Sequence, residues 1–167
     1  MSIQDFYAAV QEKEFARNFQ FKVRTLGPFT EKDLLYVEST TLPGKTIQSQ
    51  TVPFFGLDFN VPGTVKYDNS SAWTVNFRVD EGANIRQKME NYVKEIWDDE
   101  TSTGKYGVPV EQATFDLLGK DLQPLRRYTF VGLYPVTVGE LSYNVTDAGT
   151  ILTMPAIFAY QYYRIDQ

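Results

Sequence analysis

The stretch from residue 72 to residue 97 changes its hydrophobic period partway along, and this change limits the folds open to the chain. Residues 73–79 alternate between apolar and polar, which predicts a strand with one buried face. Its apolar positions are Trp73, Val75, Phe77 and Val79. Residues 83–97 then predict a helix that Asp80 caps, with an apolar stripe at helical spacing. The stripe holds Ile85, Met89, Tyr92, Val93, Ile96 and Trp97. An amphipathic strand followed by an amphipathic helix predicts a sheet with a helix packed against it.

Other alternating segments predict the remaining strands. Residues 18–24 predict a strand, and residues 34–40 are expected to pair with it as a hairpin. Residues 113–118 and 125–131 predict two strands around a turn, residues 132–141 look irregular, and 150–163 predict the final strand. Pro155 should mark an edge or a bulge there. The predicted core residues are Phe19, Phe21, Trp73, Val75, Phe77, Ile85, Met89, Val93 and Phe158. The predicted fold is mainly β, an antiparallel β-sandwich or barrel with one flanking helix.

Residues 41–63 predict a long protruding β-hairpin. The segment contains three prolines and three glycines, and proline at this density does not suit a central strand. Phe54 and Phe55 lie near its tip, just before Gly56. Adjacent apolar residues at such a tip need a partner surface. The alternative is a loop that folds back over its own core.

The length of 167 residues favours one domain over 1–167. Residues 1–15 carry Ile3, Phe6, Tyr7 and Val10 at helical spacing. They predict either a short amphipathic helix or an arm that orders against a neighbouring molecule.

Composition excludes several classes of function. The formal net charge of −5 argues against affinity for a nucleic-acid backbone. The chain has no His and no Cys, so the commonest metal sites and nucleophile–base pairs are missing. It lacks a phosphate-binding glycine motif, and the acidic run from Asp98 to Glu100 is best interpreted as solvated charge at a helix exit. We therefore expect no cofactor and no enzymatic activity, with a carbohydrate-active jelly roll as the remote alternative. No apolar run is long enough to span a bilayer, so we expect a soluble protein made in the cytoplasm.

Several segments, in order, resemble one family. Residues 132–141, Gly-Leu-Tyr-Pro-Val-Thr-Val-Gly-Glu-Leu, strongly resemble a segment of the tail tube proteins of contractile-tailed bacteriophages. The resemblance continues at residues 15–18 (Phe-Ala-Arg-Asn), at 41–44 (Thr-Leu-Pro-Gly) and at 73–75 (Trp-Thr-Val). It also includes residues 80–81, residues 86–88 in the helix and an aromatic terminal strand. Residues 98–124 show no match.

The resemblance implies a structural virion protein whose hexameric rings stack into the inner tail tube and conduct the genome into the host cell. The implied partners are further copies of the chain, the tail sheath, baseplate and tail-terminator proteins. The tape-measure protein and DNA would pass through the lumen without specific binding, and nothing would insert into a membrane. The hairpin would make the contact between rings through Leu42, Pro43, Phe54, Phe55 and Leu57. The alternatives within the class are the tube of a phage-derived injection or secretion system and a tube-initiating baseplate protein. Such baseplate proteins usually carry extra domains, for which 167 residues leave no room.

A conduit for DNA should not bind it, and six chains of −5 give −30 per ring. Basic residues nevertheless lie on predicted strands: Lys22, Arg24, Arg78, Arg126 and Arg127. We predict that these cations point outward or form ion pairs with carboxylates of a neighbouring subunit.

Overall fold

A computed structural model describes residues 2–166 of the chain. Most strands join one seven-stranded sheet with the order β1-β8-β9-β10-β5-β2, and β11 pairs with β9 beside that path. The bounds are β1 Phe21–Leu26, β2 Val37–Thr40, β5 Trp73–Arg78, β8 Glu111–Leu118, β9 Pro124–Val138, β10 Thr153–Ala159 and β11 Tyr162–Asp166. Every pairing is antiparallel, which confirms the predicted class of fold. Met1 and Gln167, the ends of the predicted domain, lie outside the described residues.

The long strand β9 divides this sheet into two halves that face each other. Its first part pairs with β8 and β11, and its last part pairs with β10. Gly132 lies at the change of partner with φ +72, and a Cβ there would stand 2.5 Å from the Gln161 side chain. A side chain would therefore meet both backbone strain and a clash. We call β1, β8, the first part of β9 and β11 sheet A, and the last part of β9 with β10, β5 and β2 sheet B.

The core fills the space between the two sheets. Trp73 of β5 stacks on Phe130 of β9 with ring centroids 4.4 Å apart, and Phe77 stacks on Phe29 at 5.1 Å. Among the predicted core residues, Trp73, Val75, Phe77, Ile85, Met89 and Phe158 are buried. Phe21 and Val93 are partly buried and pack against the same cluster.

The flanking helix α3 (Asn84–Ile96) directs Ile85, Met89 and Tyr92 into the core. Ala83 occupies the cap position in a left-handed conformation, with φ 50. The capping group is the predicted Asp80, whose carboxylate accepts hydrogen bonds from the backbone N–H groups of Asn84 (3.1 Å) and Ile85 (3.2 Å). Burial alone would raise the pKa of Asp80, but these bonds outweigh it and lower the pKa. The stripe ends before Trp97, which is exposed in the short strand β6 (Trp97–Asp98) that pairs with β7 (Thr103–Gly104).

The prediction that Phe19 belongs to the core is wrong. Strand β1 begins at Phe21, and Phe19 is 66% exposed in a turn. The turn forms because the Gln20 N–H donates to the Arg17 carbonyl, and the Gln20 side chain accepts from the Arg17 N–H. Strand β8 ends at Leu118, whose N–H bonds to the Gln20 carbonyl. The alternating pattern of residues 18–24 thus begins before the residues that pair with β8.

The segment predicted as one strand over 34–40 begins as a helical turn. Helix α2 (Glu31–Leu34) starts with a capping box between Thr30 and Asp33, and β2 follows it. Strand β2 pairs with β5 and not with the first strand, so the expected hairpin is wrong. Buried Leu34 instead joins the core, and α2 contacts β1.

Two predictions at the end of the chain also change. Residues 132–138, expected to be irregular, continue β9, and the expected final strand is split into β10 and β11. Pro155 lies in β10, which has a neighbour on each side. Strand β9 ends at Val138 opposite Ala156, so Pro155 has a ladder partner only on β5. Proline is therefore tolerated there as it is on an edge strand.

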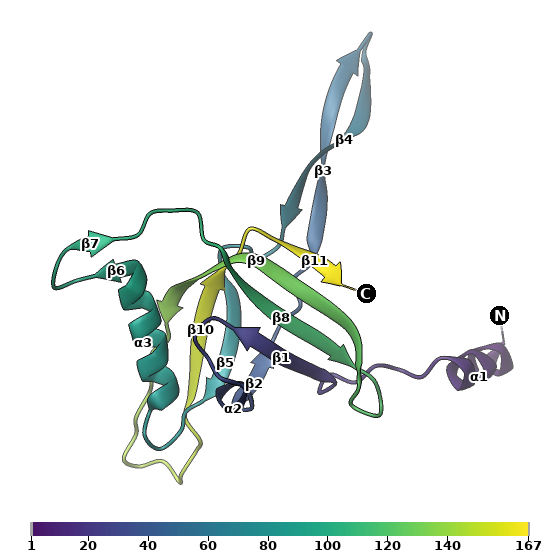
Figure 1. Cartoon of the computed structure of the whole chain (residues 1–167). Coiled ribbons are helices and arrows are strands. Elements are labelled where there is room, and N and C mark those ends of the chain that lie inside the picture. Colours follow the sequence, from purple (N-terminus) through teal and green to yellow (C-terminus); the bar gives the residue numbers. More distant parts are fainter. Residues whose placement is uncertain (1, 167) are drawn as a thin grey trace.

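Two segments project from the body of the molecule (Figure 1). One is the hairpin of β3 (Lys45–Phe54) and β4 (Leu57–Tyr67), which stands clear of the two sheets. The other is the N-terminal helix α1 (Ile3–Glu12), which a capping box between Ser2 and Asp5 starts. The side chains of α1 make no buried contact in the single chain.

Candidate assembly and conduit surfaces

The protruding hairpin is amphipathic. Paired residues share one face of a two-stranded ribbon, and the pairs Phe54–Leu57, Val52–Phe59 and Gln50–Val61 place five apolar side chains together. The opposite face carries the pairs Pro53–Asp58, Thr51–Asn60 and Ser49–Pro62. The apolar residues are all solvent-exposed: Val52, Phe54, Leu57, Phe59 and Val61. We call these five residues the hairpin apolar face. A soluble monomer rarely leaves such a continuous patch uncovered, so the face points to a partner surface.

The tip of the hairpin carries an energetically unfavourable residue. Phe55 and Gly56 form a two-residue turn with φ values of 46 and 80, the pattern of a type I′ turn. Glycine adopts this left-handed conformation freely, whereas a bulky side chain destabilises it by about 1–2 kcal/mol. Phe55 is also 93% exposed, so the single chain gains nothing from its ring beyond an edge contact with Phe54. A residue that is strained and exposed at a loop tip indicates a contact outside the chain.

Two of the five residues predicted for contact between rings do not lie with the tip. Leu42 and Pro43 precede β3 at the base of the hairpin, where Leu42 packs against the core and Pro43 is buried. These two side chains pack within their own subunit. The residues that sequence reasoning missed are Val52, Phe59 and Val61, although the alternation from Leu57 to Val61 was visible in the sequence.

The outer face of sheet A carries charges of alternating sign in one row across four strands. Lys22 of β1 is paired in register with Asp116 of β8, Asp116 with Arg127 of β9, and Arg127 with Asp166 of β11. We call these four residues the charged row. The adjacent row consists of Thr25, Thr114, Thr129 and Arg164. The hydroxyl of Thr25 donates to that of Thr114, and Thr129 donates to Asp166. The face is polar, and charges of opposite sign are paired across it.

Asp116 is the centre of this row. Its side chain is 4% exposed and accepts hydrogen bonds from Nε (2.8 Å) and Nη2 (3.2 Å) of Arg127. These bonds raise the pKa of the Arg127 guanidinium. Arg24 is a second cationic side chain at this carboxylate, with Nη1 3.9 Å from Oδ2 of Asp116. On sheet B, Arg78 lies 3.8 Å from Glu38.

These pairs differ from the ion pairs that the sequence predicted. The prediction was that the cations point outward or pair with carboxylates of a neighbouring subunit, whereas Arg24, Arg78 and Arg127 pair with carboxylates of their own chain. Arg126 lies in register with Leu117 and has the opposite parity to the charged row. Cross-strand register explains the difference, since antiparallel pairing places Asp116 between Lys22 and Arg127 within one sheet.

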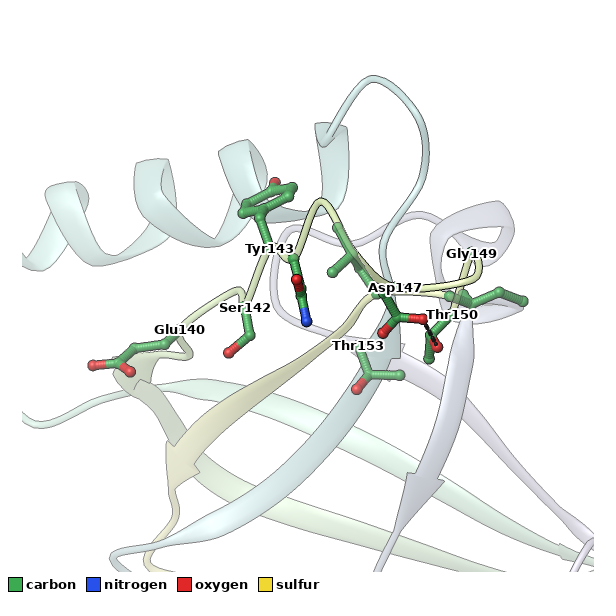
Figure 2. Close-up of a pocket in the computed structure, with 10 residues that line it drawn as sticks. Glu140, Ser142, Tyr143, Asp147, Gly149, Thr150 and Thr153 are labelled. Atoms are coloured by element: carbon green, nitrogen blue, oxygen red, sulfur yellow. Dashed lines mark hydrogen bonds between the residues drawn. The ribbon is translucent and has the colours of Figure 1, made fainter.

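The acidic groups considered for catalysis form an ion-pair cluster at the end of α3. Asp98 and Glu100 both lie near the ammonium of Lys94, at 3.7 and 3.4 Å, at the exposed exit of α3. Two further carboxylates, Glu140 and Asp147, line a cavity of about 490 Å³ within the loop after β9. Figure 2 shows that Glu140 points away from Asp147, which accepts a hydrogen bond from Thr150. The first pair is thus held by a lysine, and the second pair points in different directions.

The chain matches known proteins along nearly its whole length. It is 26% identical over 168 aligned positions to the tail tube protein gp19 of Enterobacteria phage T4, covering 98% of this chain and 99% of that protein. It is 25% identical to the tail tube protein gp19 of Enterobacteria phage T6 with the same coverage. The chain is a homologue of phage tail tube proteins. No protein-family model matches it. The homology confirms the prediction of a structural protein and not an enzyme.

Solved structures share the fold of this tail tube homologue. A chain in the PVC sheath–tube complex of an extracellular contractile injection system aligns with a TM-score of 0.67 at 12% identity, covering 99% of this chain and 98% of that one. A chain in the tube-terminating cap of the anti-feeding prophage aligns with a TM-score of 0.69 at 15% identity, covering 92% of each. At these identities the likeness concerns the fold alone. Within residues 2–166, no helix combines the length and apolar character needed to cross a bilayer.

Proposed function

We propose that copies of this chain assemble into hexameric rings that stack into the inner tube of a contractile phage tail, the conduit for the genome in the virion. The observation that carries the proposal is the homology to phage tail tube proteins across 98% of the chain. The phage relatives match in sequence, whereas the injection-system proteins match in fold at 12–15% identity. This difference favours a phage tail over an injection system.

The hairpin apolar face and Phe55 make the contact between stacked rings in this proposal. The hairpin projects from the body (Figure 1), so it can reach a second subunit without distorting its own sheets. Burial of apolar side chains contributes roughly 25 cal/mol per Å². A repeated contact through three Phe, one Leu and two Val per subunit is therefore the source of stacking free energy in this proposal.

The outer face of sheet A, with its charged row, lines the bore in this proposal. A passing DNA duplex presents dense negative charge, and every unpaired cation in the wall would add salt-dependent affinity. The pairing of Arg24 and Arg127 with Asp116 supports this role because the carboxylate offsets one of their two positive charges within the subunit. Sheath, baseplate and terminator proteins are the proposed partners at the outside and the ends of the tube.

Electron microscopy of the concentrated, purified protein tests the proposal. Tubes or stacked rings in negative stain are the expected result. Dispersed monomers at every concentration and salt condition would contradict it. The identity of the neighbouring genes then separates a phage tail from an injection system.

A further inference from the structure

The apolar stripe of α1 has no buried partner surface within residues 2–166. Ile3, Phe6 and Tyr7 are 86%, 61% and 66% exposed, and Val10 continues the stripe one turn later. Figure 1 shows the helix standing away from both sheets. An isolated helix shorter than about 12–15 residues is only marginally stable in water, and α1 has ten residues. Its stripe therefore requires a surface to pack against.

The arm that carries α1 leaves the body at one end of strand β8. Phe21, where the arm joins β1, is in register with Leu117 near the end of β8. The Glu14 carboxylate, two residues after α1, lies 3.2 Å from the ammonium of Lys120 in the turn that follows β8. These contacts fix the start of the arm beside the β8–β9 turn.

An apolar groove lies at the other end of β8. The loop of residues 105–110 forms one wall, and Tyr106, Val108 and Val110 are 85%, 84% and 83% exposed. Its floor includes the buried residues Tyr92 and Leu133, and the cavity measures about 540 Å³. We call this feature the 105–110 groove. Strand β8 begins beside it at Glu111.

The helix cannot reach the groove of its own chain. From Glu111 to Leu117 a strand rises about 20 Å, at roughly 3.4 Å per residue. The contact between Glu14 and Lys120 holds the end of α1 within a few residues of the opposite end of β8. The two apolar surfaces therefore lie at opposite ends of the same strand, and each is available to another molecule.

We propose that α1 of one copy packs into the 105–110 groove of a second copy of this chain. The inference rests on the proposed function to the extent that copies of the chain assemble. The stripe of α1 on one copy contacts a different surface, the 105–110 groove, on the next copy. Such a head-to-tail contact repeats from subunit to subunit until a ring closes. The contact thus links neighbouring subunits through segments separate from the hairpin.

The two surfaces share an apolar character and offer one complementary charge. The stripe from Ile3 to Val10 extends about 10 Å along the helix axis, at 1.5 Å per residue. Phe6 and Tyr7 at its centre are the kind of aromatic anchors that dominate interface energetics. Helix α1 contains Asp5 and Glu12 and no basic residue, while the groove is lined by one exposed lysine, Lys105, and by Glu111, which accepts a hydrogen bond from Tyr92. A carboxylate of the helix therefore has Lys105 as its ion-pair partner at the groove.

Chemical cross-linking tests the contact without background, because the chain contains no cysteine. A Gln11→Cys variant, beside the stripe, is mixed with a Gly107→Cys variant, beside Val108, and treated with a short flexible bis-maleimide. Both positions are exposed, and neither substitution removes an apolar side chain of the contact. A mixed dimer, identified by mass spectrometry of the linked peptides, is the expected product. The matched control mixes Gln11→Cys with Val145→Cys, because Val145 is fully exposed in the loop after β9, away from the groove. A yield no higher than in the control would overturn the proposal, as would cross-linking only within one chain of the Gln11→Cys/Gly107→Cys double variant.

A second pair of variants tests the apolar stripe itself. Adding Tyr7→Ser to the Gln11→Cys chain should lower the mixed-dimer yield about tenfold, the effect of roughly 1.4 kcal/mol of binding free energy. Adding Ala8→Ser, away from the stripe, should leave the yield unchanged. An equal effect of both would overturn the proposal. Micrographs of the same samples separate the two hypotheses: rings without the mixed dimer reject this contact alone, and a mixed dimer without rings supports the contact and counts against the tube.

Discussion

Asp116 on β8 lies in register opposite Arg127 on β9 and receives two hydrogen bonds from its guanidinium, at 2.8 and 3.2 Å. The same carboxylate lies 3.9 Å from Arg24. One buried acidic group therefore contacts two arginines on the outer face of sheet A and offsets one of their two positive charges. Removal of that group would leave cations without a partner on the surface proposed to face the genome.

We expect the Asp116→Asn variant to bind duplex DNA at low salt, whereas the unsubstituted chain does not. The affinity of the variant for DNA should fall about threefold per phosphate contact when the salt concentration rises fourfold. This dependence is expected because binding releases counterions from the DNA. Fluorescence anisotropy of a short labelled duplex measures both quantities. The control is Glu38→Gln, which frees Arg78 on sheet B. Binding by the control and not by Asp116→Asn would mean that sheet B faces the bore.

The tip of the hairpin gives a prediction in which folding and assembly change in opposite directions. Phe55→Asn places a residue suited to the left-handed region before Gly56, which should stabilise the turn by about 1 kcal/mol. Amide hydrogen exchange in residues 50–61 should slow accordingly. Tube formation should nevertheless decline, because the exposed ring is lost. Faster exchange would contradict the assignment of strain to Phe55.

The Phe54→Ser/Phe55→Ser double variant tests the stacking role directly. We expect a folded subunit that no longer forms long tubes, as measured by light scattering and electron microscopy. Asp58→Ser, on the polar face of the same hairpin, is the control and should assemble normally. Normal tubes from the double variant would remove the hairpin apolar face from the contact between rings.

The core predictions concern the two faces of β5. Phe77 and Phe158 are completely buried, so truncation of either to Ala should destabilise the subunit by about 3–5 kcal/mol. Thr74 lies on the other parity, and Thr74→Ala should change the free energy of unfolding by less than about 0.5 kcal/mol. Urea unfolding followed by tryptophan fluorescence measures all three. Similar losses from Thr74→Ala and Phe77→Ala would contradict the assignment of faces.

The hydrophobic periodicity of single segments could be predicted well from the sequence, whereas the pairing between strands could not. The alternation of β5 and the stripe of α3 are encoded within a few residues, so both elements could be predicted with their buried faces. The partner of β2 could not, because residues 31–34 form a helical turn before it and its pairing with β5 joins segments far apart in the sequence. The prediction that Phe19 is buried is wrong for a related reason. The alternating pattern that includes Phe19 continues beyond the end of β8.

The assembly surfaces show the same limit. The aromatic tip of the hairpin was visible as an apolar pair in a proline-rich segment. The role of Asp116 was not visible, because Lys22, Asp116, Arg127 and Asp166 are far apart in sequence and meet only through the register of four strands. Charge pairs across a sheet require the register, which a single sequence does not supply.

The ion pair between α2 and α3 predicts how stability depends on pH. The ammonium of Lys88 lies 2.6 Å from Oδ2 of Asp33, whose side chain is 15% exposed. Burial alone would raise the pKa of Asp33, but hydrogen bonds from Lys88 and Thr30 lower it below its ordinary value. A carboxylate whose pKa is lower in the folded state stabilises the protein above the unfolded pKa of about 3.9. That stabilisation is lost as the pH falls through the folded pKa.

We therefore expect Asp33→Asn to lower the free energy of unfolding by about 1.5–3 kcal/mol at neutral pH, the range for hydrogen bonds to charged groups. The difference from the unsubstituted chain should shrink as the pH falls from the unfolded pKa of about 3.9 through the lower folded pKa. Urea unfolding from neutral to acidic pH measures the convergence. Asp99→Asn, in the exposed exit of α3, is the control and should leave the curve unchanged. A difference that does not shrink at any acidic pH would mean that Asp33 acts through packing or capping geometry and not through its charge.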